Sequence, residues 1–283
     1  MATIEYMPAR LTPKETEELR QAVACLEGAS FAQRLTDAVG RPVGMLSRAM
    51  PQSARRVIAH VSETALRGAL KLALRTLDLN ASAKPANRAH RLAAAASGAV
   101  GGALGLAALP FELPISTTIL LRSIAEIARE EGEDLSAPDA AFACVEVFAL
   151  GGQGGGESAF ESGYFAVRAA LAKSVTDSAR FVAAQGVAAL PAPLVARLIS
   201  QIAARFGIVV SEKVAAQAAP ILGAIGGAAV NAAFADHFQT LARGHFIVRR
   251  LERQHGASVV AFEYQRLQGE RSREYAESRR AAS

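Results

Sequence analysis

The stretch from Leu92 to Leu121 reads LAAAASGAVGGALGLAALPFELPISTTILL and contains one charged residue, Glu112, in thirty positions. An unpaired charge is too costly to bury, so this carboxylate has to be hydrated, paired or protonated. The long apolar run therefore belongs either to a membrane-facing element or to the core of a large helical domain. Either fold has to accommodate Glu112.

The same stretch is long enough to span a membrane but is poor in residues that favour insertion. Leu92–Phe111 is uncharged over 20 residues, which meets the length of a spanning helix. Twelve of these residues are Ala or Gly, whereas insertion favours Leu, Ile, Phe and Val. Small residues recur at every fourth position from Ser97 to Gly105, which lets two helix backbones approach closely. With a turn at Pro110 and Pro114, the sequence favours a buried helical hairpin with Glu112 at its tip; partial insertion and a true span are the alternatives.

The composition of the whole chain predicts an all-α protein. Hydrophobic residues make up 51% of the 283 positions, but aromatic residues only 6%, and Trp is absent. Alanine has the highest helix propensity, and residues typical of strands are few. We expect a single large multi-helix domain with the Ala/Gly-rich hairpin at its centre. Its expected parts are an N-terminal helical arm (1–52), a main helical domain (53–256) and a polar, partly helical tail (257–283).

Charge and cysteine content narrow the function classes. The net charge of +5 suits contact with an anionic membrane surface or a membrane protein. Nucleic-acid binding is not expected, because stacking aromatic residues are not interleaved with the basic ones. The two cysteines form no disulfide framework, and the N-terminus lacks a secretory pattern. We therefore expect a cytoplasmic protein, peripheral to the inner membrane.

A long amphipathic helix over Ser53–Asp78 carries the clearest basic surface. Arg56, Arg67 and Lys71 fall on one helical stripe, opposite an apolar face. Such a stripe is either an ordinary solvated face or a surface that lies on anionic lipid. These three residues are the predicted lipid or partner contacts.

Motifs for common chemistries are missing, so we expect neither a metal nor a cofactor. The five histidines form no pair spaced four residues apart on a helix, as a zinc helix requires. The glycine-rich run Gly151–Gly156 is followed by Glu157 and Ser158 instead of the Lys and Ser/Thr of a phosphate loop. We interpret it as a flexible connector. A Gly-x-Ser-x-Gly nucleophile motif is also absent.

Two polar groups remain as weak catalytic candidates. The first is Glu112 with its neighbours Thr117, Thr118 and Arg122, where the carboxylate could simply cap the following helix. The second lies on a later helix and contains Asn231, Asp236, His237, Arg243 and His245. An asparagine in an apolar helix has to find a hydrogen-bond partner. Each group is therefore either a buried set of hydrogen bonds that holds helices together or part of a functional site. Such a site would use Glu112, Asn231, Asp236 and His237.

Several stretches together resemble the EcsC protein family. The signature segment is Leu113–Ala125 (LPISTTILLRSIA), and further similar stretches are Glu157–Arg168, Gly223–Asn231 and Asp236–Arg253. The resemblance covers roughly residues 55–256. It implies a bacterial protein of a group named for a gene beside an ABC transporter, some of whose members carry a peptidase label. It supplies no mechanism that could be transferred residue by residue.

These observations give two functional expectations. The first is a cytoplasmic, membrane-associated helical accessory or interaction protein, based on the basic helix and the Ala/Gly-rich runs. The alternative is a peptidase-like hydrolase that uses a polar cluster of the Glu112/His237 type. The hydrolase requires both polar groups to converge on one water-accessible cleft.

Overall fold

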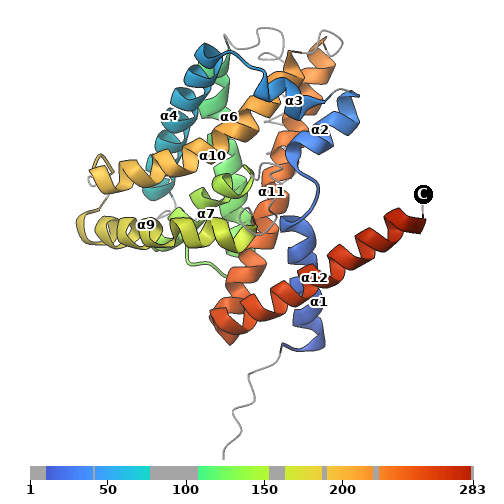
Figure 1. Cartoon of the computed structure of the whole chain (residues 1–283). Coiled ribbons are helices and arrows are strands. Elements are labelled where there is room, and N and C mark those ends of the chain that lie inside the picture. The colour runs from blue at the N-terminus through green and yellow to red at the C-terminus, as the bar shows by residue number, and fades with distance from the viewer. Residues whose placement is uncertain are drawn as a thin grey trace, which may run out of the picture. The chain divides into compact units, whose positions relative to one another are not determined.

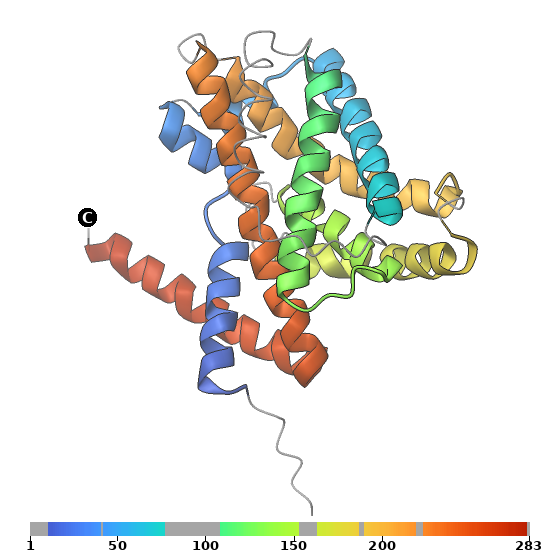
Figure 2. The same cartoon turned by 180° about the vertical axis from the view of Figure 1, so that it is seen from behind.

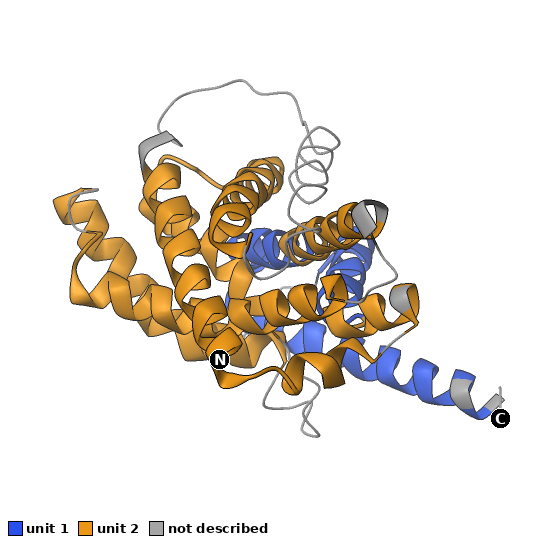
Figure 3. Ribbon diagram, turned by 90° about the horizontal axis from the view of Figure 1, so that it is seen from above, with its two compact units in different colours: residues 1–28, 243–283 blue, residues 29–242 orange. Residues whose placement is uncertain are grey.

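The computed structural model describes residues 11–40, 42–76, 108–152, 163–186, 190–218 and 223–281. These residues form ten helices and no strand, so the predicted all-α class is confirmed. Contacts divide the chain into two compact units, coloured separately in Figure 3. Unit 1 comprises Met1–Gly28 with Arg243–Ser283, and unit 2 comprises Ala29–Ala242. The three parts expected from the sequence remain a prediction.

Unit 2 is built around one long helix, α10. Its helices are α2 (Phe31–Val39), α3 (Val43–Arg48), α4 (Gln52–Thr76), α6 (Leu109–Glu130), α7 (Pro138–Leu150), α9 (Tyr164–Gln185), α10 (Pro193–Gln217) and the first part of α11 (Gly223–His255). Helix α10 contacts α2, α3, α4, α7 and α9 (Figure 1). Helices α4 and α6 lie side by side (Figure 2). Every residue of α7 from Ala140 to Leu150 is buried.

Phenylalanine rings fill the core between α7, α10 and α11. The ring of Phe148 lies 5.0 Å from that of Phe206 and 5.1 Å from that of Phe238. Phe234 joins them at 5.1 Å from Phe238. Edge-on and tilted contacts at these distances stabilise a core beyond the area that they bury. A chain with few aromatic residues thus places several of them in one cluster.

Helix α10 is the one described helix that is long and apolar enough to cross a membrane by length and composition. In its most apolar window, 44% is buried inside the structure. Buried core helices of soluble proteins satisfy the same criterion, so α10 alone is weak evidence for a span. It packs against α2, α3, α4, α7 and α9 and places Phe206 among the rings of α7 and α11, as a core helix does.

The predicted turn at Pro110–Pro114 is wrong, because α6 runs without interruption from Leu109 to Glu130. Pro110 occupies the start of the helix, where its missing N–H would have had no partner. Pro114 stands inside the helix and removes one backbone hydrogen bond. Glu112 therefore lies in the first turn of a helix and not at a hairpin tip. The run from Leu92 to Ala107, including the predicted small-residue helix, lies outside the described residues.

The two glycines that follow α7 are packing positions. A side chain at Gly152 would place its Cβ 2.3 Å from the carbonyl oxygen of Arg205 on α10. A Cβ at Gly151 would lie 2.8 Å from the ring of Phe238 on α11. The flexible-connector interpretation therefore fails for these two buried residues, and Gln153–Gly156 lie outside the described residues.

Unit 1 joins the two ends of the chain. It contains α1 (Pro13–Leu26), the end of α11 and α12 (Ala257–Ala281), with α1 packed on α12. A capping box between Thr12 and Glu15 begins α1. At Gly244 on α11 the backbones are so close that a Cβ would lie 3.0 Å from the carbonyl oxygen of Ala22. Polar contacts link the helices as well: Arg250–Glu18, His255–Glu15, Arg20–Glu270 and Tyr264–Glu27.

Candidate functional site

The charge of Glu112 is matched by a lysine that lies a hundred residues further along the chain. Lys213 on α10 donates from Nζ to Glu112 Oε1 over 2.6 Å. Asn231 on α11 donates from Nδ2 to the same oxygen over 3.1 Å. All three residues are buried, and the exposed fraction of Lys213 is 0%. We call these three residues the buried polar centre; it joins α6, α10 and α11.

Burial opposes the charge of Lys213, and two contacts favour it. Removal from water lowers the pKa of Lys213, while the adjacent Glu112 carboxylate acts in the opposite direction. The ammonium also lies 4.7 Å from the centre of the Phe234 ring, within the range of a cation–π interaction. The pair resembles other buried ion pairs, in which each charge is tolerated because the partner is present.

Sequence reasoning missed Lys213, although the sequence carried a signal. Phe206, Val209, Val210 and Ala216 are buried on α10, and Lys213 falls on the same helical face. A lysine inside an apolar stripe needs a buried partner. The carboxylate of Glu112, alone in its own apolar run, was a candidate for that partner, although the sequence does not encode the pairing.

Of the predicted candidates, Glu112 and Asn231 come together, and the others have different neighbours. His237 is buried against the ring of Phe31, at 5.2 Å between centroids, and beside Phe238. Asp236 lies at the surface, 3.7 Å from Arg34. No described contact joins His237 to Glu112. The proposed catalytic roles of these residues remain predictions.

The imidazole of His237 is held neutral. Desolvation, with a smaller effect of Arg34, lowers its pKa to about 3, and a backbone hydrogen bond with Gly151 acts the other way. Its Nε2 has no hydrogen-bond partner among the described residues. A buried imidazole of this kind is a poor proton shuttle at neutral pH, because its cationic form is not accessible.

The remaining members of the two predicted groups are dispersed. Thr117 is buried, Thr118 donates to the carbonyl oxygen of Pro114, and Arg122 is exposed. Arg243 and His245 belong to unit 1. Among the described residues, no group of three or more His, Cys, Asp or Glu side chains is arranged to hold a metal ion.

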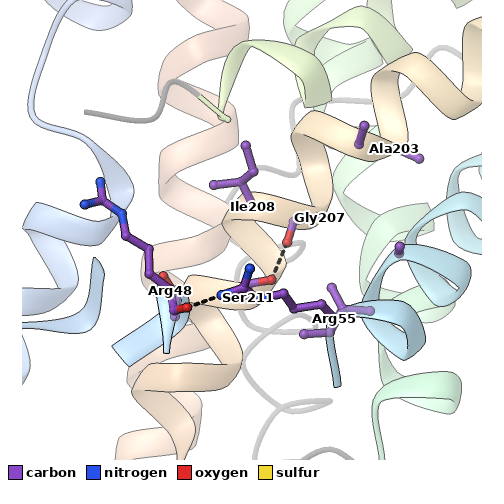
Figure 4. A pocket seen from close by; sticks show the side chains of 10 residues that line it. Arg48, Arg55, Ala203, Gly207, Ile208 and Ser211 are labelled. Atoms are coloured by element: carbon purple, nitrogen blue, oxygen red, sulfur yellow. Dashed lines mark hydrogen bonds between the residues drawn. The ribbon is translucent and has the colours of Figure 1, made fainter. Parts of the chain in front are cut away.

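A cleft of about 280 Å³ lies where α3, α4 and α10 meet. Its polar lining comes from Ser47, Arg48, Arg55 and Ser211. Figure 4 shows the Arg55 side chain reaching toward α3, where it donates to the carbonyl oxygen of Arg48, and Ser211 donating to Gly207. The Arg48 guanidinium extends away from Arg55 in this view (Figure 4).

Exposed apolar side chains occur on the three helices that form this cleft. Met45 is 69% exposed, Leu46 40%, Val57 41% and Ile208 41%. Met45 and Leu46 share the short helix α3 with Arg48, and Ile208 lines the cleft itself. We call this surface the α3–α4–α10 face; it comprises Met45, Leu46, Arg48, Arg55, Arg56 and Ile208. In the described part of the chain, no carboxylate forms a salt bridge with Arg48, Arg55 or Arg56.

The three predicted lipid contacts are exposed, but they differ in their surroundings. Arg56, Arg67 and Lys71 all lie on the solvent side of α4. Arg67 is paired with Glu63 at 2.8 Å, which neutralises that part of the helix. Arg56 and Lys71 form no salt bridge among the described residues, and Arg56 lies in the first turns of α4, next to the cleft residue Arg55.

Comparison with known proteins places this fold in a family. The model of the EcsC protein family matches residues 5–251, which is most of the chain. The chain belongs to the EcsC protein family. Neither the curated proteins nor the solved structures gave a match. The EcsC resemblance is thus confirmed; the segment Leu113–Ala125 lies within the match and within α6, the helix that carries Glu112.

Proposed function

We propose that this EcsC-family protein is a peripheral membrane-associated accessory protein that lies on anionic lipid through the α3–α4–α10 face. The observation that carries the proposal is that exposed apolar side chains and arginines without a described salt bridge occur together on the three helices that form the cleft. Surfaces of this composition bind at the boundary between headgroups and acyl chains, because the apolar groups insert while the cations attract anionic lipid. A cytoplasmic location beside the inner membrane, with a membrane protein as partner, belongs to this proposal.

Vesicle flotation tests this proposal. We expect the protein to float with vesicles that contain phosphatidylglycerol and not with pure phosphatidylcholine, and to detach as salt rises because exposed charges are screened. The double variant Arg55→Glu/Arg56→Glu should lose flotation. Arg67→Glu is the matched control, because Glu63 already neutralises Arg67. Equal flotation of the double variant and the wild type would refute the proposal.

A fluorescent reporter identifies the side chains that insert. The chain has no Trp, so Met45→Trp introduces a single indole on the exposed side of α3. Its emission should shift to the blue on anionic vesicles as the ring leaves water. The control is Tyr275→Trp, on an exposed position of α12 outside this face, whose emission should stay unchanged.

The buried polar centre gives the hydrolase alternative less support than the cleft gives the membrane-associated role. Glu112 Oε1 already accepts hydrogen bonds from both Lys213 and Asn231. General acid–base chemistry needs a group within reach of its substrate, whereas Lys213 has no solvent exposure. The geometry favours a structural role for this centre.

A further inference from the structure

The cleft at the α3–α4–α10 face has a lining of mixed character. One part is polar and includes Arg55 and Ser211. The rest is apolar: Ile58 and Ile208 line it, and the small residues Ala59, Ala203, Ala204 and Gly207 leave it hollow where α4 and α10 meet. A purely electrostatic surface would not need an apolar hollow behind its arginines. The lining therefore matches an amphiphile better than a free anion.

The size of the cleft limits what can enter. The cleft has a volume of about 280 Å³. Pockets for drug-sized ligands begin at about 300 Å³, so the cleft lies at or below their lower limit. It has room for a headgroup phosphate and the first part of one chain. Two complete acyl chains do not fit.

Arg55 is the residue that would bind the negatively charged phosphate of a ligand. Its guanidinium carries five N–H donors in a planar fork, and one of them is used on the Arg48 carbonyl oxygen. The remaining donors suit a phosphate, which guanidinium groups bind in a bidentate manner. Arg55 is exposed and forms no salt bridge with a described carboxylate, so a phosphate would not have to displace an internal carboxylate.

We propose that the cleft holds a single anionic phospholipid, with its phosphate on Arg55 and the start of one chain against Ala59, Ala204 and Ile208. The inference rests on the proposed function and deepens it: the face would select one lipid molecule in addition to adsorbing on a charged surface. The membrane is its source, since the exposed Met45 and Leu46 share the short helix α3 with the lining residues Ser47 and Arg48.

Titration calorimetry with dispersed short-chain lipid tests the cleft separately from the vesicle surface. We expect dihexanoyl phosphatidic acid, below its micellar concentration, to bind the full-length protein. Glycerol 3-phosphate, octanoate and dihexanoyl phosphatidylcholine should each bind about tenfold more weakly or worse, because each lacks the chain, the phosphate or the net charge. Binding of glycerol 3-phosphate or octanoate as tight as that of phosphatidic acid would overturn the proposal.

Two variants locate the binding. Ala204→Leu fills the cleft from an exposed position, so we expect binding of dispersed lipid to fall about tenfold or more while flotation on anionic vesicles persists. Ser200→Leu is the matched control, since Ser200 is exposed one turn away on α10 and does not line the cleft. Arg55→Gln should weaken dispersed-lipid binding to a similar degree. Unchanged binding in Ala204→Leu would refute the cleft site.

The outcomes separate this inference from the proposed function. Flotation without binding of dispersed phosphatidic acid would overturn the inference and leave surface attachment standing. Binding of dispersed phosphatidic acid without flotation would support the cleft and refute peripheral attachment. Loss of both in Ala204→Leu, with an unchanged circular dichroism spectrum, would refute the cleft as a distinct site, because surface adsorption does not need the hollow.

Discussion

Glu112 and Lys213 are each tolerable in the core only because of the other. A buried ion pair recovers by mutual attraction and hydrogen bonds much of what both charges lose on leaving water. Asn231 supplies an additional hydrogen bond to the same carboxylate oxygen. The centre therefore fixes how α6, α10 and α11 pack together more than it adds to stability.

Removing one member of this pair should cost much more than removing both. We expect Glu112→Gln to lower the free energy of unfolding by about 3–5 kcal/mol, because Lys213 is left as an uncompensated buried cation. The double variant Glu112→Gln/Lys213→Met should recover most of this loss. Urea denaturation of the single and double variants measures the coupling. Additive losses would show that the two residues do not act as a pair.

Glu212, the neighbour of Lys213, makes stability depend on pH. Desolvation raises the pKa of Glu212 to about 7, although the Ala32 N–H and Arg48 lower it. The folded protein therefore holds a proton on this group at pH values where the unfolded chain has released it. The resulting stabilisation is complete below about pH 4.5 and is lost as pH rises through 7.

Glu212→Gln tests this linkage, because Gln keeps a carbonyl oxygen that can accept from Ala32. We expect the variant and the wild type to be similarly stable near pH 4.5. At pH 8 the variant should be more stable, by on the order of 3 kcal/mol, since the wild type then carries a buried charge. The measurement is the free energy of unfolding of both proteins at each of the two pH values. A parallel pH dependence in the two proteins would contradict the assignment.

At the scale of elements, the positions least tolerant of substitution are glycines at which two segments pack backbone against backbone. The turn after α7 meets α10 at Gly152, where only hydrogen fits against the Arg205 carbonyl oxygen. We expect Gly152→Ala to lower the free energy of unfolding by about 1–3 kcal/mol or more, because backbone must move to admit the methyl group. Thermal unfolding measures the loss.

Gly207 on α10 provides the matched control for Gly152. A Cβ at Gly207 would meet its nearest neighbour, Ser62 Oγ, at 3.9 Å, which is an ordinary contact. Replacing Gly by Ala inside a helix stabilises it by about 0.5–1 kcal/mol when space allows. Gly207→Ala should therefore raise the melting temperature slightly. A similar loss in both variants would show that close packing is not the cause at Gly152.

The elements could be predicted from local patterns, whereas the partners of the polar residues could not. Capping at Thr12 and the helix end before Gly132 depend on neighbouring residues, and both are present. The contact between Glu112 and Lys213 depends on how α6 and α10 pack, which no local pattern encodes. Pro114 was misjudged for the same reason, since tertiary packing keeps α6 continuous across a residue that usually ends a helix.

At the scale of the whole molecule, the ends of the chain belong to the same compact unit. Unit 1 combines residues near the N-terminus with the last forty or so residues, whereas unit 2 holds the buried polar centre and the cleft. Helix α12 buries Val260, Tyr264 and Leu267, and α1 buries Leu19 and Val23. We expect α1 to depend on α12 for burial of its apolar face, because an isolated amphipathic helix of this length is marginal in water.

Deletion of residues 257–283 should therefore destabilise unit 1 and leave unit 2 folded. Hydrogen exchange read by mass spectrometry should show loss of protection in peptides from α1 (Pro13–Leu26) and retention in those from α4, α7 and α10. The matched control is deletion of residues 272–283, where every side chain with a described environment is exposed, so α1 should stay protected. Loss of protection throughout the chain after the longer deletion would mean that the two units unfold as one, since separate cooperative units open independently.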